Sequence, residues 1–261
     1  MIFDLKSGKR RRVVQIVFGV LAFIFFVSFV GFGVGTGNGA GGLFDALGIG
    51  GGNTASSPQY DAQIQRAEDT LRTDPKNEKA LVSLARTHFL AGQSATGTDD
   101  QGRITYTDET LTDYRDATAA WERYLATKPK QPDDGVASLM LQAYTALAGS
   151  DPARIQQDVD QAFKAAQIVA DARPSFGSYL QLATYAYYAG DEKAGAEAEK
   201  KALAEAPDST SRNQAKAQVK QAKAQGAAIQ KAIKQSAPDQ SQLENPLGGL
   251  GGTQAPLPSG G

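Results

Sequence analysis

The sequence predicts an all-α protein in which one transmembrane helix precedes a solenoid of helical hairpins and a C-terminal capping helix. Three observations lead to this prediction. An uncharged apolar stretch follows a basic N-terminus. A longer, more polar segment has helical patterning almost throughout. Prolines interrupt that patterning at intervals typical of helix pairs, at Pro75, Pro129, Pro174 and Pro207.

The apolar stretch, residues 13–34, is long enough to cross a bilayer. A helix of that length measures about 33 Å, and the hydrocarbon core is about 30 Å thick. Five basic residues lie in the tail 1–12, and the next basic residue after the stretch is Arg66. The positive-inside rule therefore predicts a single-pass cell-membrane protein with a cytoplasmic N-terminus and an extracytoplasmic main domain. A cleaved signal peptide is the alternative, but its apolar core would be only about 7–15 residues long.

Composition limits the remaining function classes. Residues 1–12 carry a charge of +4 and the rest of the chain −5, which argues against nucleic acid as a partner. The absence of cysteine excludes disulfides and thiolate sites, and the single histidine, His88, excludes a site with several histidines. Residues 35–57 are rich in Gly and predict a flexible linker, and residues 237–261 predict a disordered tail.

The segment 58–236 contains spaced large and small residues that recur in helix pairs. The clearest set is Tyr179, Leu182, Ala183, Ala186, Gly190, Ala202, Leu203 and Pro207. A second set is split by an insertion at 94–113, and consists of Leu81, Leu84, Ala85, His88 and Gly92 followed by Ala117, Trp121, Tyr124, Leu125 and Pro129. A looser pair covers 136–174, and the register of its first helix, 136–148, stays open.

These spacings resemble those of the tetratricopeptide (TPR) repeat family. The resemblance covers about 150 residues and about three and a half repeats, although the first-helix tryptophan of the family pattern is absent. Other helical-hairpin arrays remain the alternative. The segment 209–236, rich in Ala, Gln and Lys, has the polar character of a capping helix for such an array.

The resemblance implies that another protein or peptide binds in a groove lined by the first helices. Mapped onto the two clearer repeats, the groove positions are Lys79, Val82, Arg86, Phe89, Gln181, Thr184, Tyr187 and Tyr188. For Tyr187 and Tyr188, packing against the capping helix is an equally good interpretation.

The other chemical features favour structural interpretations. His88 occupies an inward position, so we expect a packed histidine rather than a ligand or a general base. The acidic insertion 94–113 lacks the spacing of a calcium loop and predicts a surface loop or a small hairpin. The basic segment 209–236 predicts a solvated face, with an acidic partner or anionic lipid as the alternative. We therefore expect no enzyme activity, no metal and no cofactor.

The sequence thus predicts a membrane-anchored extracytoplasmic adaptor that binds another protein, in protein export or envelope chaperoning. Its order of segments is similar to that of the ancillary TPR subunit of the bacterial SecYEG translocon, and the resemblance is limited to this order. The alternative is a structural envelope scaffold acting through its basic cap helix and tail. The small-residue spacing Gly31-x-x-x-Gly35 suggests a homo-oligomer through the membrane helix, with the start of the Gly-rich linker as the alternative interpretation.

Overall fold

The computed structural model describes residues 58–100 and 103–236, which form an all-α array with one small β hairpin. The predicted cytoplasmic tail, membrane helix, linker and C-terminal tail lie outside these residues. Among the helices that the structure describes, none is long and apolar enough to cross a membrane. The helices and strands are α3 (Pro58–Thr73), α4 (Glu78–Ser94), β1 (Gly97–Thr98), β2 (Ile104–Thr105), α5 (Asp108–Ala126), α6 (Asp134–Ser150), α7 (Ile155–Ala172), α8 (Phe176–Ala189), α9 (Glu192–Ala204) and α10 (Ser209–Ser236).

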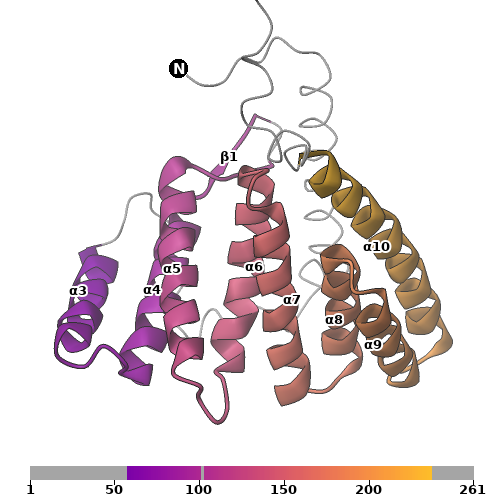
Figure 1. Cartoon of the computed structure of the whole chain (residues 1–261), viewed down its shortest axis with the longest axis horizontal. Coiled ribbons are helices and arrows are strands. Elements are labelled where there is room, and N and C mark those ends of the chain that lie inside the picture. The colour runs from indigo at the N-terminus through magenta and orange to yellow at the C-terminus, as the bar shows by residue number, and fades with distance from the viewer. Residues whose placement is uncertain (1–57, 101–102, 237–261) are drawn as a thin grey trace, which may run out of the picture.

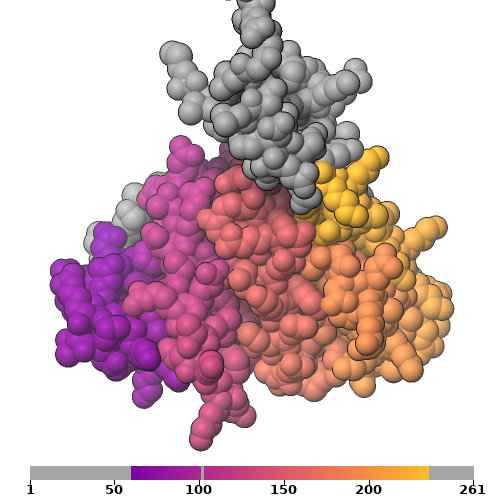
Figure 2. All heavy atoms as spheres, in the orientation of Figure 1, coloured from indigo at the N-terminus to yellow at the C-terminus, as the bar shows by residue number. Residues whose placement is uncertain are grey.

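The helices stand side by side in a row that follows the order of the sequence (Figure 1). Within residues 58–100 and 103–236, α4 pairs with α5, α6 with α7 and α8 with α9, and each pair packs against the next. Helix α3 packs on α4 at one end, and α10 packs mainly on α8 at the other. The space-filling view shows the same succession, because the colours follow one another across the surface from α3 to α10 (Figure 2).

A side-chain cap fixes the start of the first helix in each pair. Asn77 accepts a hydrogen bond from the backbone N–H of Ala80, at 3.0 Å, and Asp133 accepts one from Val136, at 2.8 Å. Ser175 accepts one from the N–H of Ser178, at 3.2 Å. These bonds satisfy backbone donors that a helix start otherwise leaves unpaired.

Counting from these caps gives all three first helices the same register. Four, seven and eight residues after each cap lie the side chains that pack inside the array. They are Leu81, Leu84 and Ala85 in α4, Ala137, Met140 and Leu141 in α6, and Tyr179, Leu182 and Ala183 in α8. The register of 136–148, which the sequence left open, therefore follows from the cap at Asp133.

The predicted insertion is shorter than the range 94–113. Helix α4 continues to Ser94 and α5 begins at Asp108, so the residues from Asp108 to Asp113 form the first turns of α5. Between the helices, β1 and β2 pair in antiparallel fashion, with Gly97 opposite Thr105. Thr107 caps α5 by accepting a hydrogen bond from the N–H of Thr110, which ends the connection. The helix α10 coincides with the segment predicted to cap the array.

Two clusters of buried side chains form the core. The first extends from α3 to α7 and contains Trp121, Phe89 and Tyr144. The second joins α8, α9 and α10 with residues of α6 and α7, and contains Tyr187, Val219 and many alanines. Helix α7 contributes to both clusters, through Ala162 and Val159 respectively. The array is therefore held by a continuous series of contacts between neighbours.

Candidate protein-binding face

The first helices α4, α6 and α8 carry the residues that the sequence assigned to a binding groove. We define the first-helix face by the positions five and nine residues after each cap in α4 and α6, and by their half-exposed counterparts in α8. Its residues are Val82, Arg86, Ser138, Gln142, Gln181 and Thr184. Gln142 is exposed and the other five are partly buried.

Ion pairs connect this face to neighbouring helices. Arg86 of α4 lies 3.7 Å from the carboxylate of Asp133, the residue that caps α6. Within the second pair, Arg173 at the end of α7 forms an ion pair with Asp134 of α6, and its Nη2 donates to the hydroxyl of Ser138 at 3.1 Å. The first contact links two neighbouring hairpins, and the second joins the two helices of one hairpin.

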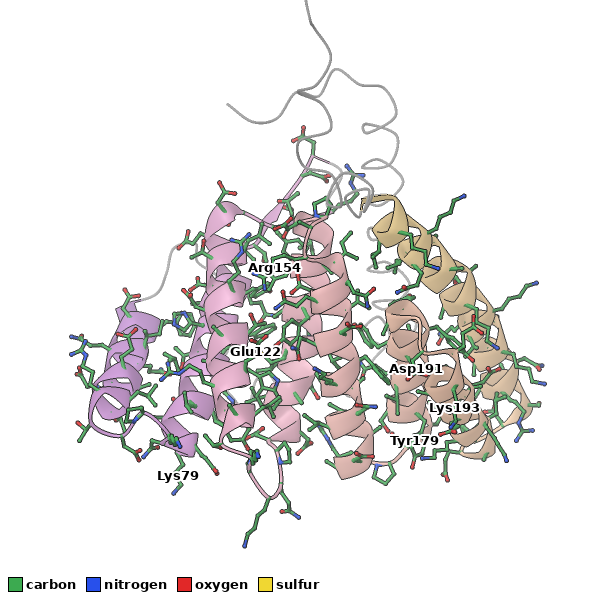
Figure 3. The ribbon with its side chains drawn as sticks, in the orientation of Figure 1. Lys79, Glu122, Arg154, Tyr179, Asp191 and Lys193 are labelled. Atoms are coloured by element: carbon green, nitrogen blue, oxygen red, sulfur yellow. The ribbon has the colours of Figure 1, made fainter. Side chains whose placement is uncertain are left out.

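The structure separates the eight predicted groove residues into two groups. Lys79 is exposed in the first turn of α4 and points away from the array (Figure 3). Val82, Arg86, Gln181 and Thr184 are partly accessible, and the hydroxyl of Thr184 donates to the carbonyl of Leu180 in its own helix.

The other three predicted residues, Phe89, Tyr187 and Tyr188, belong to the core. Phe89 is 1 % exposed and stacks on Tyr114 of α5, with ring centroids 5.2 Å apart. Tyr188 donates its hydroxyl hydrogen to Gln225 of α10 at 2.6 Å. A partner cannot reach these side chains in this conformation, so their assignment to the groove is corrected.

The backbones of α9 and α10 approach Tyr187 closely, each at a glycine. A Cβ atom on Gly195 of α9 would lie 2.6 Å from its ring, and a Cβ on Gly226 of α10 would lie 2.1 Å from its carbonyl oxygen. Its hydroxyl donates to Glu199 at 3.0 Å, and the Lys223 ammonium lies 5.0 Å from its ring centroid. Of the two interpretations of Tyr187 and Tyr188, packing against α10 is the one that the structure supports.

A small recess lies where α6, α7, α8 and α10 meet. It is lined by Tyr144, Thr145, Ala148, Val159, Ala162, Tyr185, Tyr188 and Ile229. The hydroxyls of Thr145 and Tyr185 lie 2.9 Å apart and bridge α6 to α8. Desolvation raises the pKa of Tyr185, and the hydrogen bond with Thr145 acts in the opposite direction. The cavity volume is about 10 Å³, enough for roughly one water molecule and too small for a substrate.

Asp158 of α7 is a buried carboxylate that the sequence analysis did not single out. Its side chain is 1 % exposed, and the nearest cation, Nη2 of Arg154, lies 3.6 Å away. Neither carboxylate oxygen has a hydrogen-bond partner. Burial raises the pKa of Asp158 to about 6, and the charge of Arg154 lowers it only in part. The group is perturbed but enclosed within the helix pairs, so it does not line an open cleft.

The structure also brings together three side chains that the sequence treated separately. His88 of α4 lies beside Asp113 and Asp116 of α5. The sequence does not reveal this proximity, because the β hairpin separates His88 from the two aspartates along the chain.

Comparisons with protein-family models, with curated proteins and with solved structures find no match to this chain.

Proposed function

We propose that this chain is a single-pass, membrane-anchored adaptor whose TPR-like helical domain lies outside the cytoplasm and binds another protein on the first-helix face. The common register of α4, α6 and α8 carries the proposal. Because each first helix begins at a side-chain cap and repeats the same packing positions, accessible side chains recur along one face of the row. They lie five and nine residues after the cap in α4 and α6, and six and nine residues after it in α8, where Leu180 at the fifth position is buried. Arrays of this kind present an extended surface suited to a peptide or a helix.

The chemistry of the first-helix face suits recognition of a polypeptide. It combines an aliphatic side chain at Val82, amides at Gln142 and Gln181, and a guanidinium at Arg86. Amides can both donate and accept hydrogen bonds, so they fit the backbone of an extended segment. Arg86 is already paired with Asp133, which leaves it positioned for a further acceptor.

Residues 1–57 supply the membrane part of the proposal through their sequence alone. The apolar stretch 13–34 would anchor the chain, and the Gly-rich segment 35–57 would connect it to the helical domain. A Gly-rich segment of about 23 residues has a root-mean-square length near 25 Å. This tether would confine the domain near the bilayer and raise its effective concentration around membrane partners, such as components of protein export.

We favour binding over catalysis because the two features that most resemble a reactive site are both inaccessible to a substrate. The recess beside Tyr185 has a cavity volume of about 10 Å³, and Asp158 is enclosed. A catalytic group has to reach its substrate, either directly or through one water molecule. The accessible side chains of the first-helix face instead lie on a surface, where they can contact a partner.

Photo-crosslinking tests the proposal. A photoreactive residue placed at the exposed Gln142 should capture a discrete protein in intact membranes, because this side chain lies at the centre of the first-helix face. A probe at the exposed Lys231 of α10 is the matched comparison. Translocon components or unfolded exported chains among the adducts would indicate a role in export. Adducts from Lys231 without any from Gln142 would contradict the adaptor.

One observation favours the alternative, a structural envelope scaffold that acts through α10 and the tail. At 100° per residue, all the basic side chains of α10 fall within about 100° of arc. They are Arg212, Lys216, Lys220, Lys223, Lys231 and Lys234. The stripe borders α9, where the Lys223 ammonium lies 2.9 Å from Glu199. Charge reversal at Lys216 and Lys220 would disrupt a scaffold, and an adaptor should keep its partner after this change.

A further inference from the structure

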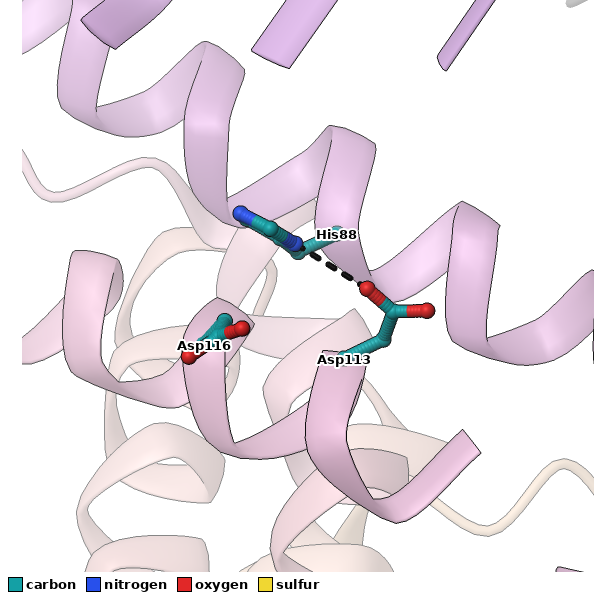
Figure 4. A group of neighbouring side chains, drawn as sticks. All are labelled: His88, Asp113 and Asp116. Atoms are coloured by element: carbon teal, nitrogen blue, oxygen red, sulfur yellow. Dashed lines mark hydrogen bonds and ion pairs between the residues drawn. The ribbon is translucent and has the colours of Figure 1, made fainter. Parts of the chain in front are cut away.

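Three potential metal ligands converge between the helices of the first hairpin (Figure 4). Nδ1 of His88 lies 3.1 Å from Oδ1 of Asp113. One ligand atom from each of His88, Asp113 and Asp116 lies within 4.8 Å of the other two. The side chains of His88 and Asp113 are 12 % and 17 % exposed, and Asp116 is exposed. The trio is therefore sheltered on one side and accessible on the other.

The backbone holds this arrangement from both helices. Asp113 and Asp116 are three residues apart in α5, so their side chains share one face of the helix. Gly92 lies one turn after His88 in α4, where a Cβ atom would be 2.9 Å from the Cβ of Asp113. The missing side chain at Gly92 thus lets α4 approach α5 beside the trio. The positions of the ligand-bearing residues follow from helix packing rather than from a loop.

The donor set indicates which ions would fit. Transition metals such as Zn²⁺ accept a mixture of imidazole nitrogen and carboxylate oxygen, at about 2.0–2.2 Å from the ion. Tetrahedral ligands at these distances lie about 3.3–3.5 Å apart, close to the separation of His88 and Asp113. Asp116 needs only a side-chain rotation, which its exposure permits. Calcium and magnesium prefer sites made entirely of oxygen, so the imidazole favours a transition metal.

We propose that His88, Asp113 and Asp116 bind a divalent transition-metal ion of the Zn²⁺ class, with water in the remaining coordination position. Two carboxylate ligands bring two negative charges and an imidazole ligand brings none, so a divalent ion balances the charge of this donor set. The ion links α4 to α5 across the β hairpin and stabilises the first hairpin. Without the ion, the hydrogen bond between His88 and Asp113 holds the same helices together.

Titration of the full chain with Zn²⁺ tests this site. The protein is prepared without an affinity tag, in detergent micelles, and stripped with a chelator. Calorimetry should show one Zn²⁺ per chain, and saturating Zn²⁺ should raise the Tm by about 5 °C. Co²⁺ should give the visible absorption of a low-symmetry site. The substitutions His88→Gln and Asp116→Asn should each weaken Zn²⁺ affinity by about tenfold or more.

Asp116→Asn is the decisive variant because Asp116 is exposed and lies outside the His88–Asp113 hydrogen bond, so the fold should persist. Asp108→Asn is its matched control, an exposed aspartate of the same helix that is outside the trio, and it should bind Zn²⁺ like the wild type. Absence of Zn²⁺ binding would overturn the proposal. Equal affinity of the wild type and Asp116→Asn would also overturn it, as would equal binding of Ca²⁺ and Zn²⁺.

Discussion

The two ends of the row fill the space between helices in opposite ways. In the first hairpin, large buried rings fill much of the core: Phe89 of α4 stacks on Tyr114 of α5 with ring centroids 5.2 Å apart, and Trp121 of α5 is 1 % exposed. In the third, α8 and α9 approach through Ala183, Ala198 and Ala202, all almost fully buried. Helix α10 comes closer still, since Gly226 packs directly on the backbone of Tyr187.

The difference shows that one spacing of core positions supports two kinds of packing. Large rings provide stability through the apolar area that each one buries, whereas small residues provide it through close contact between backbones. The first arrangement should be sensitive to the loss of volume and the second to its addition. Substitutions at the two ends of the row should therefore have opposite dependence on side-chain volume.

Removing the largest side chain of the first cluster should have the largest effect. Trp121 is 1 % exposed, so Trp121→Ala should lower the free energy of unfolding by about 4 kcal/mol through lost apolar contacts and a cavity. Urea denaturation followed by circular dichroism measures the change. Trp121→Phe retains most of the contacts and should cost roughly half as much. A loss below about 1 kcal/mol for the alanine variant would mean that the rings do not carry the stability of this end.

Asp158, in a helix that contributes to both clusters, should make stability depend on pH. Its pKa is raised from 3.8 to about 6, so the folded state binds the proton more tightly than the unfolded state. Its contribution is therefore most favourable below pH 4 and worsens by about 3 kcal/mol as the pH rises through 6. Asp158→Asn should lack this decrease. Parallel curves of unfolding free energy against pH for the two proteins would contradict the assignment.

Adding volume to the second cluster should destabilise it despite a gain in helix propensity. Gly226→Ala should lower the free energy of unfolding by about 2 kcal/mol, since the new Cβ collides with the Tyr187 carbonyl oxygen and alanine favours the helix by only about 1 kcal/mol. Gly177→Ala is the matched control, because a Cβ at Gly177 meets no atom within 4 Å. It should be neutral or stabilising. Stabilisation by Gly226→Ala would refute the close packing of α10 on α8.

The links between hairpins should contribute least. Arg86 and Asp133 are 43 % and 33 % exposed and lie 3.7 Å apart, so Arg86→Ala should lower the free energy of unfolding by less than about 1 kcal/mol. Added salt should weaken this contribution, because exposed charges are screened. Thermal unfolding in low and high salt measures it. A much larger loss would mean that this ion pair, rather than core packing, joins α4 to α6.

The helical pairing was predictable because its signals are local. Prolines and the small residues at Ala183 and Gly190 indicate where helices pack and turn, and the basic segment that forms α10 is evident from its composition. The register of α6 was harder to predict from the sequence, because apolar residues occur on all sides of this helix and no single apolar face stands out. The polar cap at Asp133 was the available signal, because Asp commonly begins a helix.

The accessibility of individual side chains was harder to predict, because burial depends on which helices meet. Tyr188 is covered by Gln225, which lies 37 residues later, and spacing within α8 cannot reveal that contact. The approach of His88 to Asp113 spans 25 residues and the β hairpin. Asp158 follows the pattern of a surface acid in a helix, and only the packing of its neighbours removes it from water. These features arise from tertiary structure rather than from local periodicity.

The most direct test of the proposed adaptor function adds the same charge to the first-helix face and to the second helices. The double variant Gln142→Arg, Gln181→Arg modifies the first-helix face, and Ala119→Arg, Gln167→Arg modifies exposed positions on the second helices α5 and α7. Proteins that copurify from membranes are then quantified for each variant. We expect the amount of copurified partner to fall by about tenfold with the first double variant and to stay unchanged with the second. Equal retention by both variants, or loss only with the second, would contradict the proposed function.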